Sequence, residues 1–94
     1  MKKYFNYSLQ LKSLDDPSKE LSINVQNHDD LFAIMERLEK KEIFEISTQA
    51  QSFAIGLKLL TEEVLRNRDN PLFNDFFKAL SLFIQKIKQH DING

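Results

Sequence analysis

Apolar and polar residues alternate in two stretches near the start of the chain. Every second residue is apolar in the segment FNYSLQL and again in LSINV. A period of two residues is typical of strands that have one buried face. We therefore predict strands at about residues 4–12 and 20–26. The turn-forming segment Asp15-Asp16-Pro17 lies between them, so the strands should pair as an antiparallel hairpin.

Beyond the hairpin, apolar residues recur every three or four positions, as one face of an amphipathic helix requires. This period predicts three helices, at about residues 28–41, 48–67 and 71–89, and a tail at 90–94. The chain is then an α+β protein, an N-terminal antiparallel hairpin followed by three helices. Ninety-four residues bury one core rather than two, so we expect a single domain over residues 1–94.

Each predicted helix starts beside a residue that can cap it. Asn27 precedes the first helix, Ser47 or Thr48 the second, and Asn70 the third. The oxygen of such a side chain accepts a hydrogen bond from a backbone N–H of the first turn. Pro71 also suits the first position of the third helix, because its fixed φ is helical and no N–H is needed there.

The third predicted helix has an unusually broad aromatic face. Phe73, Phe76, Phe77 and Phe83 lie on it at helical spacing. The favoured interpretation is a core-facing surface. Two alternatives stay open, a self-association surface and an apolar ligand pocket between helices. The four phenylalanines are therefore the candidate interaction surface.

Composition and charge narrow the classes of function. Hydrophobic residues make up 41% and charged residues 29%, as in ordinary globular domains. The net charge of −1 gives no field that would attract a phosphate backbone, so nucleic acid is not an expected partner. The longest apolar run is too short to cross a membrane, and no secretory signal is visible, so we expect a cytoplasmic protein with no membrane partner.

Candidate catalytic and metal-binding groups are few. The two histidines, His28 and His90, are far apart in sequence, and the chain has no cysteine. His28 is followed by Asp29 and Asp30, but neighbouring residues on a helix point in different directions, so capping is favoured over a metal site. We therefore expect no enzyme, no metal and no cofactor.

The second predicted helix contains two further features. Glu62 and Glu63 should be solvated on its surface, with Glu62 paired to Arg66 four residues later. Gly56 costs a helix interior about 1 kcal/mol relative to alanine. Close approach of a neighbouring backbone could offset that cost.

Three segments, NHDDLFAI at 27–34, FAIGLKL at 53–59 and RNRDNPLF at 66–73, occur in this order. Together they resemble a family of small bacterial proteins known only as a domain of unknown function. The resemblance spans nearly the whole chain and implies a compact, stand-alone bacterial protein of hairpin-plus-helices architecture. It implies no activity and no binding residue. Among the polar residues of these segments, the candidates for a polar site are His28, Asp29, Arg66 and Arg68.

The leading functional hypothesis is a non-enzymatic interaction or accessory protein that self-associates or binds a protein partner. The aromatic face of the third helix and the edges of a two-stranded hairpin are the surfaces that motivate it. The alternative is a regulator that binds a small ligand. Its pocket would lie under the third helix, with Arg66, Arg68 or His28 at the mouth.

Overall fold

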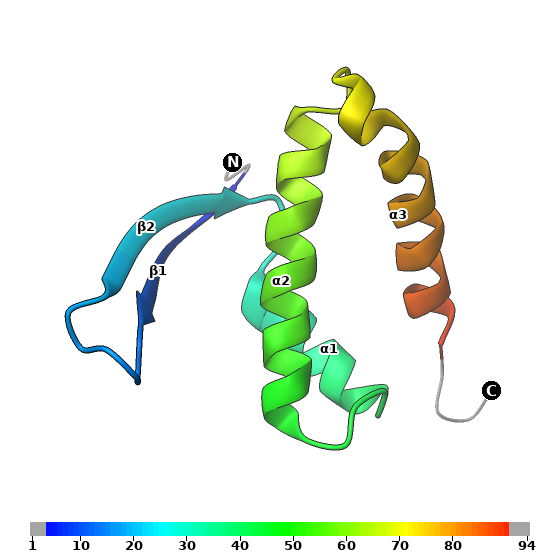
Figure 1. Cartoon of the computed structure of the whole chain (residues 1–94). Coiled ribbons are helices and arrows are strands. Elements are labelled where there is room, and N and C mark those ends of the chain that lie inside the picture. Colours follow the sequence, from blue (N-terminus) through cyan, green and yellow to red (C-terminus); the bar gives the residue numbers. More distant parts are fainter. Residues whose placement is uncertain (1–3, 91–94) are drawn as a thin grey trace. The chain divides into compact units, whose positions relative to one another are not determined.

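A computed structural model describes residues 4–90 of the chain and contains a hairpin followed by three helices (Figure 1). The predicted α+β class is confirmed. The chain divides into two compact units, Met1–Asp30 and Leu31–Gly94, which we call the hairpin unit and the helical unit and describe separately. A single domain over the whole chain stays a prediction, and most of the predicted tail at 90–94 lies outside the described residues.

The hairpin unit consists of strands β1, Phe5–Lys12, and β2, Glu20–Asn27. The strands are antiparallel, and their register pairs Tyr7 with Val25 and Leu9 with Ile23. Apolar residues therefore meet apolar residues on one face, except where Phe5 meets Asn27, and polar residues meet on the other. Both strands lie within one residue of the predicted bounds.

Side chains within the loop hold the hairpin turn. The Ser13 hydroxyl oxygen accepts hydrogen bonds from the backbone N–H groups of Asp15, at 3.2 Å, and Asp16, at 3.0 Å. Asp16 Oδ1 in turn accepts from the backbone N–H of Ser18 at 3.1 Å and from its hydroxyl at 2.7 Å. These bonds satisfy the loop backbone locally, as expected of Ser and Asp in turns.

Helix α1 spans Leu31–Lys40, so the predicted start at residue 28 is wrong. Asn27 ends strand β2, and its side-chain oxygen accepts from the backbone N–H of Asp29 at 3.0 Å. The side chain thus closes a turn after the strand, and the helix begins only after that turn. Leu31 and Leu38 are buried, as the helical period predicts.

Helix α2 spans Ser47–Arg66, and its capping residue is Ile46, which has an extended backbone and provides no side-chain hydrogen bond. The prediction that Ser47 or Thr48 caps this helix is therefore wrong, because both residues lie inside the helix.

Helix α3 spans Pro71–Gln89, and both its bounds and its capping residue, Asn70, are as predicted. Asn70 Oδ1 accepts from the backbone N–H of Leu72 at 3.0 Å, and Pro71 occupies the first turn. Between residues 4 and 90, no helix combines the length and the apolar composition that crossing a membrane needs.

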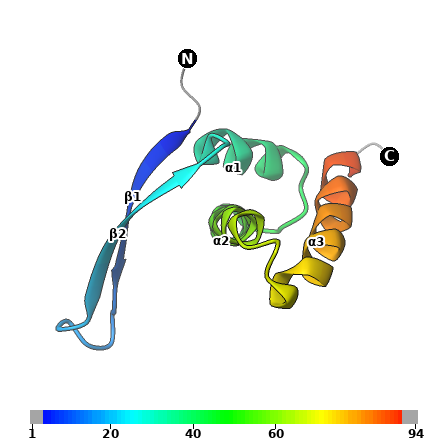
Figure 2. The same cartoon turned by 90° about the horizontal axis from the view of Figure 1, so that it is seen from above.

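The core of the helical unit forms around α2, which lies between α1 and α3 in Figure 2. Leu38 of α1 packs there with Ala50 and Ala54 of α2, and all three are at most 3% exposed. Two alanines one turn apart give α1 a smooth surface to approach closely. The half-buried side chains packed around this centre are Ile34, Met35, Phe44, Phe53 and Ile87.

Lys41 ties the connection after α1 to the end of α3. Its Nζ donates to the backbone oxygens of His90, at 2.8 Å, and Lys88, at 3.3 Å. The last carbonyls of a helix lack partners within the helix and carry partial negative charge, so an ammonium group is a favourable partner.

Candidate interaction surface

The aromatic residues of α3 divide into two sets. Phe73 and Phe77 are half-buried, whereas 42% of Phe76 and 45% of Phe83 remain exposed. Leu80, between them in sequence, is buried. The interpretation of the face as core is therefore right for one stripe of the helix and wrong for the neighbouring stripe.

The exposed stripe consists of Leu72, Phe76, Ala79 and Phe83, which follow each other at steps of four, three and four residues. Leu72 is 77% exposed. Steps of this kind place side chains along one line of a helix and are typical of a seam that packs against a second helix. Lys86, at the next step, ends the apolar stripe.

Ring contacts join this stripe to α2. The rings of Phe53 and Phe83 meet edge to face, with centroids 6.1 Å apart, and Phe53 also contacts Phe44 at 5.1 Å. Edge-to-face packing is a favourable geometry for aromatic rings. Phe83 is therefore held at one edge while much of its ring stays accessible.

Helices α2 and α3 run in opposite directions (Figure 1). Leu60 follows Phe53 by two helical turns and so lies on the same face of α2 as Phe53. Leu60 is 43% exposed. We call Leu60 of α2, together with Leu72, Phe76 and Phe83 of the exposed stripe of α3, the seam surface.

Gly56 lies one turn before Leu60 in α2. A Cβ built on this glycine would meet no atom within 4 Å. The expectation that a neighbouring backbone approaches Gly56 is therefore wrong. The missing side chain instead leaves open space at this position of α2.

The candidate polar residues fall in both units. In the hairpin unit, the ring of His28 lies 4.6 Å from the ring of Tyr4, and the backbone N–H of Asp29 is bound by Asn27. These contacts give the two residues structural roles at the end of the hairpin. In the part of the chain that the structure describes, no three His, Cys, Asp or Glu residues form a group that could hold a metal ion.

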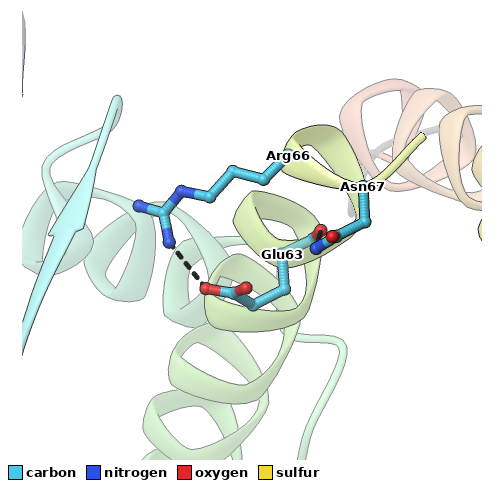
Figure 3. A network of polar contacts seen from close by, with 3 residues as sticks. All are labelled: Glu63, Arg66 and Asn67. Atoms are coloured by element: carbon cyan, nitrogen blue, oxygen red, sulfur yellow. Dashed lines mark hydrogen bonds and ion pairs between the residues drawn. The ribbon is translucent and has the colours of Figure 1, made fainter. Parts of the chain in front are cut away.

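In the helical unit, Arg66 lies in a small polar network at the end of α2 (Figure 3). Its guanidinium pairs with Glu63 at 2.6 Å, and Asn67 Nδ2 donates to the Glu63 carbonyl at 2.7 Å. The expected pairing of Arg66 with Glu62 is thus wrong. Glu62 is only 6% exposed, so its expected solvation is wrong as well. The backbone oxygen of Arg68 accepts a long hydrogen bond of 3.5 Å from Asn74 Nδ2.

The helical unit has a hollow where α1 connects to α2. Leu38, Phe44 and Ala50 form its apolar wall, and Glu39, Glu42 and Glu45 form part of its rim. Neither Arg66 nor Arg68 lines it. This hollow is therefore not the pocket under α3 that the ligand-binding alternative expects.

A hairpin that leads into three helices, with exposed apolar residues along two of them, defines a small α+β protein. The chain matches the family model described as a domain of unknown function with a solved structure, DUF3861, over residues 6–89, and it belongs to this family. The resemblance noted in the sequence is thereby confirmed.

A solved structure shares this fold. It is a protein of unknown function, eca1910, from the bacterium Pectobacterium atrosepticum SCRI1043, at 29% identity and a TM-score of 0.84. The match covers 92% of this chain and 98% of that one. Comparison with curated proteins gave no match.

Proposed function

We propose that this protein is a non-enzymatic interaction protein that binds a helical segment of a partner protein along the seam surface. The observation that carries the proposal is the exposure of Phe76 and Phe83 on one line of α3. Aromatic side chains are enriched in the centres of protein interfaces. Contiguous exposed apolar patches on small proteins often mark interaction sites.

The spacing of the surface supports a helix as the occupant. Anchors from Leu72 to Phe83 extend over about 16 Å, or three helical turns. A helix that lies in a groove presents its own anchors at the same three- and four-residue steps. The open space at Gly56 lets a partner side chain reach the α2 backbone.

Two further parts of the proposal rest on the sequence alone. The absence of a catalytic role is proposed because the chain has no cysteine and only two histidines, far apart in sequence. A cytoplasmic location is proposed because no segment has the character of a secretory signal.

The test compares a double variant, Phe76→Ser with Phe83→Ser, against Leu82→Ser. Leu82 is also exposed and apolar but lies outside the stripe. Proteins captured from a bacterial lysate by the wild type would be purified, and their affinity for each variant measured by calorimetry. The double variant should bind at least ~10-fold more weakly, since each buried aromatic anchor contributes 1 kcal/mol or more. Leu82→Ser should bind as the wild type does.

Equal binding of a purified partner by the wild type and the double variant would contradict the proposal. Binding of a small apolar molecule at one site per chain, lost in the double variant, would instead support the ligand-binding regulator. Far-UV circular dichroism confirms that each variant is folded before it is compared.

A further inference from the structure

The hairpin unit carries an apolar face that two strands alone leave open. Leu21 is 54% and Ile23 44% exposed, and both lie on β2. A two-stranded hairpin is marginal in water and becomes stable through further strands or through packing against a helix. The sheet that the described residues form has only two strands, so each strand has one edge without a strand neighbour.

These edges lack the usual protection against pairing. From residue 5 to 11 and from 21 to 27 neither strand contains a charged residue, a proline or a glycine. Proteins normally block an edge strand with lysine, proline, a bulge or a short length. Both strands are eight residues long and regular in register. No residue in these stretches therefore blocks the edge N–H and C=O groups from pairing with another strand.

The ladder shows which backbone groups of β2 face outward. The N–H of Ser13 donates to the carbonyl of Lys19 at 3.0 Å, in line with the register of the strands. Bonded and non-bonded pairs alternate in an antiparallel ladder, so the odd-numbered residues bond across the hairpin. The N–H and C=O groups of the even-numbered residues then point away from β1. In the middle of β2 these are the exposed residues Ser22, Asn24 and Gln26.

We propose that the outer edge of β2 pairs with β2 of a second copy of this chain, antiparallel and centred on Asn24. Asn24 then faces Asn24 of the second copy, and Ser22 bonds with Gln26. In this register Ile23 lies beside Val25 of the second copy, on the same side as the other apolar residues. The two hairpins form one four-stranded sheet.

Charge complementarity supports a second copy as the occupant. Continued past the ends of β2, the register brings Lys19 near Asp29 of the second copy, as an ion pair of opposite charges, and Glu20 near the polar ring of His28. No like charges face each other, and each pairing occurs twice because the arrangement is two-fold symmetric. Opposite charges across strands stabilise a pairing, whereas like charges oppose it.

The β1 edge is the weaker choice. Centred on Ser8, a β1 pairing would place Lys12 opposite Tyr4 and gain no ion pair. Three of its inward apolar residues, Phe5, Tyr7 and Leu9, are already half-buried, and Leu11, near its end, is 69% exposed. In β2, both Leu21 and Ile23 are exposed, and the proposed register gives Ile23 an apolar neighbour at the centre of the pairing. The inference uses residues of the hairpin unit alone and does not depend on the proposed function of the seam surface.

The absence of cysteine makes a clean cross-linking test possible. In the proposed register the two Asn24 Cα atoms lie about 5.5 Å apart, within the range that a disulfide spans. Asn24→Cys should therefore form a covalent dimer under mild oxidation at least ~10-fold faster than Ser8→Cys, because pairing raises the local thiol concentration. Ser8 is the matched control, since it faces Asn24 across the hairpin and is exposed on the other edge.

A second measurement uses light scattering behind size exclusion over a concentration series. The wild type should form a dimer, and Asn24→Lys should weaken it about fivefold, because two ammonium groups then face each other at the two-fold axis. Ser8→Lys and the Phe76/Phe83 double variant should keep the wild-type dimer. In the wild type, the amide of Asn24 should exchange more slowly at high protein concentration, and that of Ser8 should not.

A wild type that stays monomeric at every concentration would overturn the proposal. So would faster cross-linking of Ser8→Cys, which would assign the pairing to β1. A dimer that survives Asn24→Lys but is lost in the Phe76/Phe83 double variant would place self-association on the seam surface instead. The exchange measurement needs no variant, so a substitution that fails to fold still leaves a decisive result.

Discussion

In the hairpin loop, the carboxylate of Asp16 accepts two hydrogen bonds from Ser18. The hydroxyl of Ser18 and then its backbone N–H donate to the Asp16 carboxylate, and these bonds lower the pKa of Asp16 below its ordinary value of 3.8. Because the pKa is lower in the folded chain, the bonds stabilise the fold fully above pH 3.8. Their contribution is lost as the pH falls from 3.8 through the folded pKa.

Ser18→Ala should raise the pKa of Asp16 toward 3.8, since it removes the larger of the two causes and leaves the backbone bond. Carbon-detected NMR titration of the Asp16 carboxyl measures this directly. Ser18→Thr keeps a hydroxyl and serves as the control. An unchanged pKa in the alanine variant would show that the hydroxyl is not bonded to Asp16 in solution.

Caps were only partly predictable from individual residues. Asn70 was found because Pro71 fixes the position at which α3 starts. At α2, a hydroxyl residue looked like the cap, but the extended backbone of Ile46 starts the helix one residue earlier. At α1, Asn27 could serve a helix or a turn equally well, and only its place in β2 decides between them. The sequence names residues that can cap, and the backbone selects among them.

At the scale of elements, the period of α3 predicted its length and the width of its apolar face correctly. It could not predict which part of that face remains exposed, because this depends on how closely α2 approaches. The half-buried stripe with Phe77 and the exposed stripe with Phe76 look alike in sequence. The seam surface therefore depends on how α2 and α3 pack, with Phe53 against Phe83.

Gly56 lowers the stability of helix α2, and no neighbouring atom requires a glycine at this position. Gly56→Ala should raise the free energy of unfolding by about 1 kcal/mol, because alanine is the better helix former and its methyl group would meet no atom. Urea denaturation followed by circular dichroism provides the measurement. The control is Ser52→Ala, at an exposed position one turn earlier in α2. It should raise the free energy of unfolding by less, because serine is a better helix former than glycine. A loss of stability in Gly56→Ala would indicate that something occupies this space.

For the molecule as a whole, stability depends on a small core. Leu38→Ala should lower the free energy of unfolding by about 2–5 kcal/mol, since it leaves a cavity against Ala50 and Ala54. That is a large share of the roughly 5–15 kcal/mol typical of a domain. Leu72→Ala, at a largely exposed position, should change it by about 0.5 kcal/mol or less. Similar effects at both positions would contradict the assignment of the core.

The order of the elements could be inferred from the sequence because the periodicity of apolar residues predicts them. The family could be inferred because three local segments are typical of it. The buried position of Glu62 could not, since nothing in its neighbours in sequence distinguishes it from Glu63. Nor could the division of the chain at Asp30, which depends on where contacts concentrate. Local pattern determines the elements, whereas burial is a property of the assembled protein.

The contact of Lys41 with the end of α3 also bears on how the protein is made. The carbonyl groups that Lys41 binds come 47 and 49 residues later in the chain. During translation, α1 and α2 are synthesised before those carbonyls exist. The hairpin and the α1–α2 pair can fold on the growing chain, whereas the lysine clamp closes only after residue 90 has emerged. This contact between the connection after α1 and the end of α3 therefore forms only once α3 has been made.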